Sequence, residues 1–445
     1  MNIGLIAMSG IRVVDAELLE LGLTLPGFVE RSNIIASLPS LGLLTLAGMI
    51  PKEHSVKYIE DHQISEGEEF NNLIIGFDLI AISSFSAQIK EAYELSDKIM
   101  ALKVPVILGG LHVTCLPEEA KEHCDAVLIG EGELHWLDIL KDAQVGKLKD
   151  FYGSVDEEYD LKDSPMPAFE LLDIEKYNRL TIQTSRGCPH SCEFCASSIL
   201  ITKKYKQKPI DKVLAEIDKI KTIWEHPMIE LAEDNTFVNK EYWKELLPQL
   251  KERKIRWFTE TDISLADDES LLKSLSESGC AQVLIGFESP EVGSLDGIET
   301  KNNWKSKQFT KYKEAITKIQ SYGISVNGCF ILGLDDQDKN IFDAVFNFVK
   351  ETGLHEVQIT IQTAFPGTPL YERLEKENRI IDKGAWEKCT LFDVNFIPKK
   401  MTSEELRNGF RNLGLKLYSD EFTKYRKENF KKILRGIIKE KRRMK

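Results

Sequence analysis

The first third of the chain alternates short apolar runs with stretches of helical periodicity. Short apolar or alternating runs predict strands, and amphipathic stretches between them predict helices. Strands separated by helices form parallel sheets, so we expect an α/β fold with a doubly wound parallel sheet over residues 1–145. The expected strands are 3–7, 55–59, 79–83, 104–108 and 126–129, and the expected helices are 41–50, 89–102 and 117–123.

A second series of strands and helices runs through residues 179–377. Six units predict a partial (β/α)6 barrel that is open on one side, with functional groups at the carboxyl ends of its strands. Residues 146–178 are an expected polar linker, and residues 378–445 an expected helical extension. The expected strands are 180–185, 228–233, 255–260, 282–287, 325–332 and 356–362, with helices such as 210–223 and 242–250 between them.

Composition limits the classes of function. The 445 residues carry a net charge of −13, which disfavours general nucleic-acid binding. No apolar run approaches the roughly 20 residues of a membrane span, and the first residues enter a strand without a basic leader. With eight cysteines, three of them in one loop, the chain is expected to be cytoplasmic and reduced.

Three cysteines at C-x3-C-x2-C spacing, Cys188, Cys192 and Cys195, follow the first strand of the second series. Clustered thiolates in a reducing compartment indicate a soft metal rather than a disulfide. An iron–sulfur cube takes one thiolate per iron, so three cysteines leave one iron open to another ligand. The alternative is a zinc ion held by these cysteines and His190.

This spacing, with Phe194 before the third cysteine, resembles the radical S-adenosylmethionine (radical SAM) superfamily. The resemblance implies a 4Fe–4S cluster whose open iron is chelated by the amino and carboxylate groups of S-adenosylmethionine. One electron from the cluster then cleaves the sulfonium and yields a deoxyadenosyl radical. An electron donor such as flavodoxin or ferredoxin is therefore an expected partner.

Small-residue turns follow three strands of the first series, where such sheets bind ligands. Together with Pro39–Leu43 and in this order, they resemble the cobalamin (vitamin B12) domain of one radical SAM branch, which includes hopanoid methylases. The usual Asp-x-His-x-x-Gly motif is absent after the first strand, so no histidine is expected on cobalt, and His112 and His123 are not expected to bind metal. A domain kept only as a scaffold is the alternative. The implied cobalamin-binding residues are Ser83, Ser84, Gly109, Gly110, Gly130, Glu131 and Gly132.

The resemblance also places S-adenosylmethionine at the strand ends of the barrel. For Glu233 and Asp234, the alternative is that they lie at a solvated strand end or cap a helix that starts near Asn239. Cys280, Cys329 and Cys389 are expected to be small core residues, and no catalytic residue is identified. The candidates are Glu233, Asp234, Thr259, Glu260, Glu288, Ser289, Gly328 and Pro366.

The implied function is methylation of an unactivated carbon in a small-molecule or lipid-like substrate. The deoxyadenosyl radical would abstract hydrogen, and methylcobalamin would donate the methyl group. Radical cyclisation, oxidation or rearrangement without methyl transfer is the enzymatic alternative. A cobalamin and iron–sulfur sensor is the other alternative, although the chain shows no helix-turn-helix pattern.

Residues 424–445 carry eleven Lys or Arg and two Glu. Their apolar positions recur at helical spacing, which predicts a basic amphipathic helix. Such a helix can lie on an anionic membrane surface, or its apolar stripe can pack on the barrel. The apolar positions are Phe430, Ile433, Leu434, Ile437 and Ile438.

Overall fold

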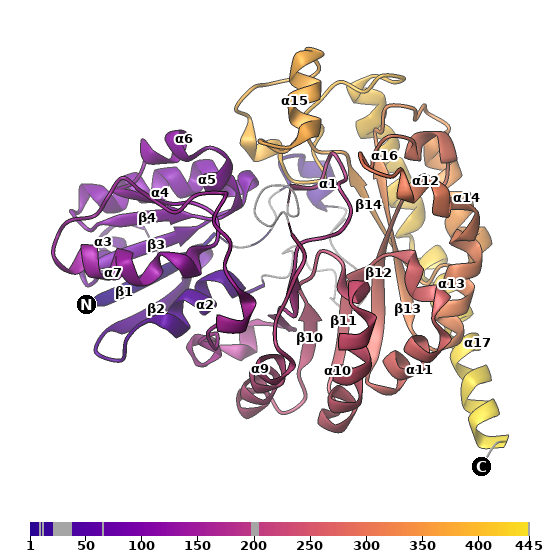
Figure 1. The fold of residues 1–445 in the computed structure, drawn as a ribbon. Helices are drawn as coiled ribbons and strands as arrows, with labels where there is room; N and C mark the ends of the chain where they lie inside the picture. Colours follow the sequence, from indigo (N-terminus) through magenta and orange to yellow (C-terminus); the bar gives the residue numbers. More distant parts are fainter. Residues whose placement is uncertain (9, 11–12, 21–37, 65, 197–203, 444–445) are drawn as a thin grey trace.

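The computed structural model describes residues 1–8, 10, 13–20, 38–64, 66–196 and 204–443. Figure 1 shows two α/β bodies side by side, with α15 above their junction and α17 running down the outer side of the second body. Both bodies are built on six-stranded sheets whose neighbouring strands are parallel. The α/β fold with two parallel sheets and a helical C-terminal part is therefore confirmed.

The first sheet has the strand order β2-β1-β3-β4-β5-β6. Ile3 of β1 pairs with Val56 on one side and with Leu79 on the other, so the order of strands reverses at β1. Ligands bind at such a switch point, outside the carboxyl ends of the strands. The strands are β1 (Asn2–Ala7), β2 (Ser55–Glu60), β3 (Leu79–Ser83), β4 (Val106–Gly109), β5 (Ala126–Leu128) and β6 (Phe151–Tyr152).

Helices cover both faces of this sheet. Ile3 and Leu5 pack with residues of α2 and α7, whereas Ile6 packs with residues of α3, α4, α5 and α6. This alternation is the period of two that an extended strand imposes on its side chains. The helices are α1 (Ala16–Glu20), α2 (Leu41–Met49), α3 (Glu68–Ile75), α4 (Ile89–Ala101), α5 (Leu111–Cys115), α6 (Pro117–Lys121) and α7 (Trp136–Gln144).

The first sheet extends into the stretch expected to be a linker. Phe151 of β6 pairs with Val127, and Tyr152 pairs with Leu128. Two residues are too short to show a periodic signal, which is why the sequence pattern did not reveal this strand. Further on, Phe169 is fully buried in the core shared with the barrel, and the Ala168 N–H donates to the Leu44 carbonyl.

The second sheet has the order β14-β13-β12-β11-β10-β7, so its strands follow one another in sequence and β7 and β14 lie at its edges. This is the expected open barrel of six βα units. The strands are β7 (Leu180–Ile182), β10 (Met228–Leu231), β11 (Arg256–Thr261), β12 (Cys280–Glu288), β13 (Ser325–Leu332) and β14 (Glu356–Ile361). The helices are α9 (Ile210–Ile223), α10 (Lys240–Arg253), α11 (Glu269–Glu277), α12 (Trp304–Gln308), α13 (Tyr312–Ser321) and α14 (Ile341–Thr352).

Three helices follow the barrel: α15 (Pro369–Lys376), α16 (Ser403–Leu417) and α17 (Asp420–Arg443). Thr402 and Glu405 form a capping box at the start of α16, as the sequence predicts. The apolar stripe of α17 packs on the barrel, because Phe430 is buried and stacks on His355 at 4.2 Å between ring centroids. Leu434 also lies against the backbone of Gly323.

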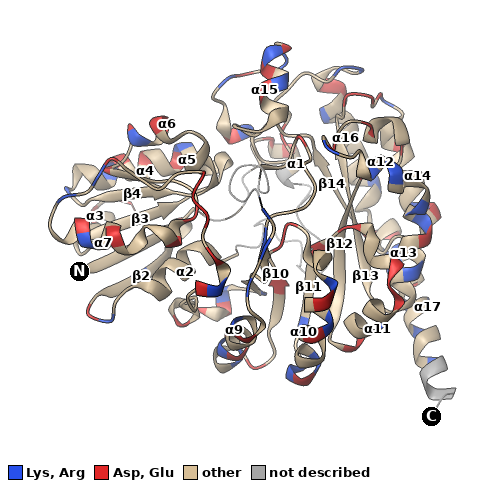
Figure 2. Cartoon of the chain, viewed as in Figure 1, with Lys and Arg blue, Asp and Glu red and all other residues tan. Residues whose placement is uncertain are grey.

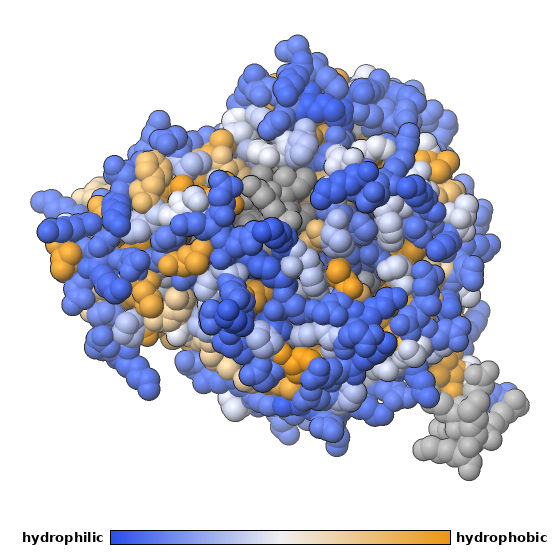
Figure 3. Space-filling model, in the orientation of Figure 1, coloured by the Kyte–Doolittle hydropathy of each residue, from blue (hydrophilic) through white to orange (hydrophobic). Residues whose placement is uncertain are grey.

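The structure therefore supports the alternative in which α17 packs on the barrel, and most of its apolar positions take part in that packing. Ile438 is the exception, with 52% of its surface exposed. The face of the molecule in Figure 3 is mostly hydrophilic, with small and scattered apolar areas. Within the described residues, no helix is long and apolar enough to cross a membrane.

Candidate active site between the two sheets

The cysteine loop begins just after β7 and is held on its first side by the end of β10. The buried Glu233 carboxylate accepts hydrogen bonds from the Thr184 N–H and from the N–H and hydroxyl of Ser185. Asp234 accepts one from the Gly187 N–H at 2.9 Å. Burial raises the pKa of Glu233 to about 7 despite these donors. Glu233 therefore shapes the backbone that leads into the loop.

The strand predicted over 180–185 is shorter than expected. It ends at Ile182, and β8 (Ser185–Arg186) then forms a separate antiparallel pair with β9 (Lys206–Gln207). This change of direction turns the chain out of the barrel sheet immediately before Cys188.

The opposite side of the loop is held by residues that follow β12. Cys192 forms an antiparallel bridge with Glu299, and the Glu193 N–H donates to the Ile298 carbonyl at 2.9 Å. The N–H and the hydroxyl of Thr300 both donate to the Ser191 carbonyl, at 3.0 and 2.9 Å. These bonds fix the backbone around the middle cysteine.

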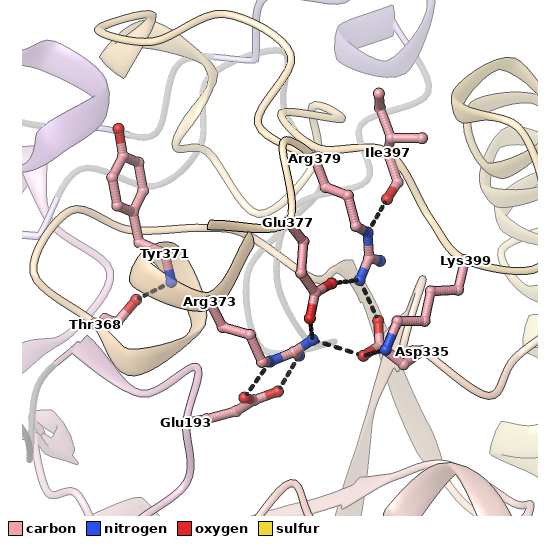
Figure 4. A network of polar contacts seen from close by, with 9 residues as sticks. All are labelled: Glu193, Asp335, Thr368, Tyr371, Arg373, Glu377, Arg379, Ile397 and Lys399. Atoms are coloured by element: carbon pink, nitrogen blue, oxygen red, sulfur yellow. Dashed lines mark hydrogen bonds and ion pairs between the residues drawn. The ribbon is translucent and has the colours of Figure 1, made fainter. Parts of the chain in front are cut away.

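A network of charged side chains clamps the loop from a third direction (Figure 4). Arg373 of α15 grips the Glu193 carboxylate with two parallel hydrogen bonds of 2.6 and 3.0 Å. The same guanidinium donates to Asp335 at 2.7 Å, and Arg379 lies 2.9 Å from the other oxygen of that carboxylate. Bidentate pairs of this kind fix orientation as well as adding energy.

Replacing Arg373 with glutamine is expected to loosen the cysteine loop. Because Arg373 is partly exposed, we expect a cost of about 1 kcal/mol, or roughly a fivefold faster loss of iron to a chelator from the reconstituted protein. The Glu193→Gln/Arg373→Gln double variant should lose iron no faster than the single variants. Lys251→Gln, which removes a surface pair with Glu277, is the control. Additive effects of the two substitutions would contradict the clamp.

The geometry favours a cluster over the zinc alternative. Within the described residues, no three His, Cys, Asp or Glu side chains converge on a point where one ion could sit. His190 instead lies 3.3 Å from Asp262, and its ring packs on Trp304. Because a four-iron cube binds each thiolate at a different iron, it does not require such convergence.

The lumen of the barrel brings together charged groups from neighbouring strands. Glu288 is nearly buried and lies 2.5 Å from Lys305, which also donates to the Gly286 carbonyl. Glu260 reaches solvent within the lumen, but protein surrounds it, and desolvation with nearby Glu230 raises its pKa to about 8. A carboxylate in this setting would gain from the arrival of a cationic ligand.

Two of the proposed S-adenosylmethionine residues face away from the lumen. Thr259 is fully buried on the same face of β11 as Trp257, and its hydroxyl bonds Thr236 at 2.5 Å. A Cβ on Gly328 would lie 2.5 Å from Leu354, so this glycine is required by packing behind the sheet. The predicted placement of the Thr259 side chain is wrong, because adjacent residues of a strand point to opposite faces. Contact between the Gly328 backbone and S-adenosylmethionine stays a prediction.

The adjacent residue Cys329 departs from its expected role as well. It is only partly buried and lies near Glu260 and Glu288 of the lumen; burial, with these two carboxylates, raises its pKa well above the usual range. Cys280 and Cys389 are buried, as expected. Ser289 is buried and accepts a hydrogen bond from the Glu291 N–H, so it stabilises a turn.

The remaining candidate, Pro366, is buried in the loop after β14. In that loop Thr368 caps α15, and the Leu370 N–H donates to the Glu193 carbonyl at 3.0 Å. The segment therefore touches the cysteine loop directly. That contact agrees with a place near the cluster, whereas contact between Pro366 and a cofactor stays a prediction.

A pocket lies between the carboxyl ends of the two sheets. The first body contributes its small-residue turns, namely Ser83, Gly109, Gly110, Gly130, Glu131 and Gly132. The barrel contributes Gln183, Arg186, Lys208, Ala232 and Asp234. Ser84 is buried beside this wall, and its carbonyl lies 2.9 Å from where a Cβ of Gly110 would stand.

The pocket suits a large ligand with hydrogen-bonding groups on its rim. Gly110 and Gly130 have φ values of 111° and 75°, so glycine is required there and the backbone is left open. Two polar atoms of the lining are buried without a partner in the described structure, the Trp136 indole N–H and the Ser164 hydroxyl. Buried polar groups are normally satisfied, so these two are suited to amide-bearing ligands such as cobalamin.

Charged groups close the pocket across the two bodies. Arg186, two residues before Cys188, lies 2.8 Å from Glu131 and 2.5 Å from Glu133. Lys206 lies 2.5 Å from the other oxygen of Glu131. Glu131, proposed as a cobalamin ligand, thus has an interdomain role that sequence reasoning missed.

None of the eight histidines lines this pocket, and all eight lie in the described part of the chain. His112 is fully buried, with its ring nitrogens 3.0 Å from Ser86 and 3.2 Å from Glu119. Trp386 from the C-terminal extension also donates to Glu119. His112 therefore helps to join that extension to the first body, as a satisfied histidine.

Family models match three parts of the chain. The Radical SAM superfamily model matches residues 182–349, and the B12 binding domain model matches residues 32–138. A domain of unknown function (DUF4070) matches residues 368–445, which include α15, α16 and α17. These matches fall on the barrel, on the first sheet and on the C-terminal helices.

Two relatives and one solved structure extend over most of the chain. The bacteriochlorophyllide d C-12(1)-methyltransferase of Chlorobaculum tepidum is 28% identical over 385 residues, which are 85% of this chain and 82% of that protein. The hopanoid C-2 methylase of Rhodopseudomonas palustris is 25% identical over 364 residues, or 78% and 66%. The radical S-adenosylmethionine methyltransferase TsrM of Kitasatospora setae, solved with cobalamin and a [4Fe-4S] cluster, has a similar fold, with a TM-score of 0.63, 13% identity and coverage of 84% and 78%. The chain therefore combines a radical SAM domain in the barrel with a B12-binding domain in the first body.

Proposed function

We propose that the protein is a cobalamin-dependent radical SAM enzyme that methylates an unactivated carbon of a small-molecule or lipid-like substrate. One observation carries the proposal. The pocket lined by the small-residue turns of the first body also reaches Asp234 and Arg186, which flank the cysteine loop. The groups for both kinds of cofactor therefore meet at one cleft.

The position of each group of residues indicates which cofactor it would bind. Cys188, Cys192 and Cys195 would hold the 4Fe–4S cluster, and S-adenosylmethionine would bind beside it. When bound, the three cofactors supply a carbon-centred radical and a methyl group for one substrate carbon. Asp234 and Glu260 would be the carboxylates that hold the cationic amino group of S-adenosylmethionine. Gly110 and Gly130 allow the tight backbone turns that would line the cobalamin site, because a Cβ at either position would meet a backbone carbonyl.

We expect cobalamin to bind without a protein histidine on cobalt, because no histidine lines the pocket. The electron paramagnetic resonance spectrum of the cob(II)alamin form should lack superhyperfine splitting from an imidazole nitrogen. Gly110→Leu should lower cobalamin content, since its side chain would meet the Ser84 carbonyl. Clear imidazole splitting in the spectrum would contradict this account of the pocket.

Cyclisation without methyl transfer is the second candidate. The anaerobic magnesium-protoporphyrin IX monomethyl ester cyclase of Cereibacter sphaeroides is 24% identical over 376 residues, or 75% of this chain and 59% of that protein. Mass spectrometry of extracts incubated with methyl-deuterated S-adenosylmethionine separates the two. A product that gains a deuterated methyl group supports methyl transfer, and a product that only loses hydrogen supports cyclisation or oxidation.

The reaction also requires a reductant, and a flavodoxin or ferredoxin in the cytoplasm is the donor we propose. Peripheral membrane contact is the weaker part of the prediction, since Phe430 and Leu434 pack on the barrel. Contact would then depend on the exposed lysines of α17 alone, and high salt should abolish any sedimentation with anionic liposomes.

A further inference from the structure

A lysine-rich stretch without acidic residues follows the segment after β12 that holds the cysteine loop. Between Glu299 and Glu314 there are five lysines and no Asp or Glu, although the whole chain has a net charge of −13. We call residues 300–313 the lysine segment. It includes α12, whose basic residues are visible in Figure 2.

Four of the five lysines are exposed, and three have no ion-pair partner among the described residues. Lys305 points inward to Glu288, and Lys311 lies 3.8 Å from Asp267. Glu299, at the start of the segment, is buried and turned toward backbone N–H groups, so it does not neutralise the surface. The three unpaired lysines are Lys301, Lys307 and Lys313.

The lysine segment is directly connected to the cluster loop. Thr300, next to Lys301, donates two hydrogen bonds to the Ser191 carbonyl, which adjoins Cys192. Trp304 packs on His190 of the same loop, with 4.5 Å between ring centroids. A protein bound on this surface would therefore lie close to the cluster, and the path to it would run through a few hydrogen bonds.

We propose that the lysine segment is the docking surface for a small acidic one-electron carrier protein of the flavodoxin type. This inference rests on the proposed function, which requires such an electron. The carrier's FMN hydroquinone is oxidised to the semiquinone, and the oxidised cluster gains that one electron. A positive surface beside the acceptor steers an acidic partner and fixes its orientation. An ordinary solvated face would need no such position beside the cysteine loop.

The test measures the binding of oxidised flavodoxin to the reconstituted protein at low and high salt. The triple variant Lys301→Glu/Lys307→Glu/Lys313→Glu should bind at least about tenfold more weakly and lose most of the salt dependence. The matched control is Lys431→Glu/Lys432→Glu/Lys439→Glu. Its exposed lysines lie on α17 near Phe430 and His355, at the opposite end of the barrel strands from the cysteine loop.

The reaction supplies a second readout. Deoxyadenosine production driven by reduced flavodoxin should fall in the first triple variant, whereas production driven by dithionite should stay unchanged. Equal flavodoxin affinity in the two triple variants would overturn the docking surface, and so would an equal loss with both reductants. Absence of dithionite-driven cleavage in the unaltered protein would instead count against the proposed function, and the binding comparison would still decide the docking surface.

Discussion

Replacing Cys188, Cys192 or Cys195 with alanine is expected to abolish the production of deoxyadenosine from S-adenosylmethionine. Each thiol holds one iron, so loss of any one leaves two irons open and the cluster poorly held. The loop backbone itself should survive, because Glu233, Thr300 and the Arg373 clamp hold it independently of metal. Chromatography of the anaerobic reaction products measures the effect.

Cys115→Ala is the matched control for the cysteine variants. This half-buried thiol lies in the first body, outside the lining of the pocket. Its replacement should leave iron content and deoxyadenosine production near those of the unaltered protein. Substantial reductive cleavage by a variant lacking all three loop cysteines would refute their assignment.

Replacing Arg186 with methionine is expected to destabilise the junction of the two bodies. Glu131 and Glu133 are nearly buried. Without Arg186, Glu133 has no cationic partner and Glu131 keeps only Lys206. Breaking a buried ion pair by removing one partner is strongly destabilising, so we expect a loss of about 3 kcal/mol. Urea unfolding, followed by probes in each body, measures the free energy of unfolding.

The control for Arg186 is Arg253→Met. Arg253 pairs with Asp218, but that carboxylate is about half exposed, so its loss should cost less than about 1 kcal/mol. Adding Glu133→Gln to the Arg186→Met variant should recover part of the lost stability, since it removes the carboxylate charge that Arg186 no longer compensates. Equal costs for Arg186→Met and Arg253→Met would contradict a structural role at the junction.

Hydrophobic periodicity was sufficient to predict most of the fold. Long apolar strands such as β3 and β13 were placed within a residue or two, because their buried faces impose a clear pattern. The strand β6 has only two residues, which is too short to show a periodic pattern. The barrel strands lie in their sequence order, as successive βα units predict.

The candidate site was less predictable than the fold. Turns of small residues, such as Gly109-Gly110, are local features and do line the pocket. Thr259 was misplaced because a position near a strand's end does not say which face it occupies. Arg186 and Arg373 were missed because the carboxylates of Glu133 and Glu193, which they hold, lie 53 and 180 residues away in sequence. Only the folded chain brings such groups together.

The most direct test of the central claim is the electron paramagnetic resonance spectrum of the reduced, reconstituted protein with and without S-adenosylmethionine. We expect a 4Fe–4S signal that changes shape when S-adenosylmethionine is added, since Cys188, Cys192 and Cys195 leave one iron open to it. Electron–nuclear double resonance with nitrogen-15 at the methionine amino group should show a changed nitrogen coupling, as direct coordination requires. A cluster signal that stays identical in its presence, or a protein that retains zinc instead of iron, would contradict the account.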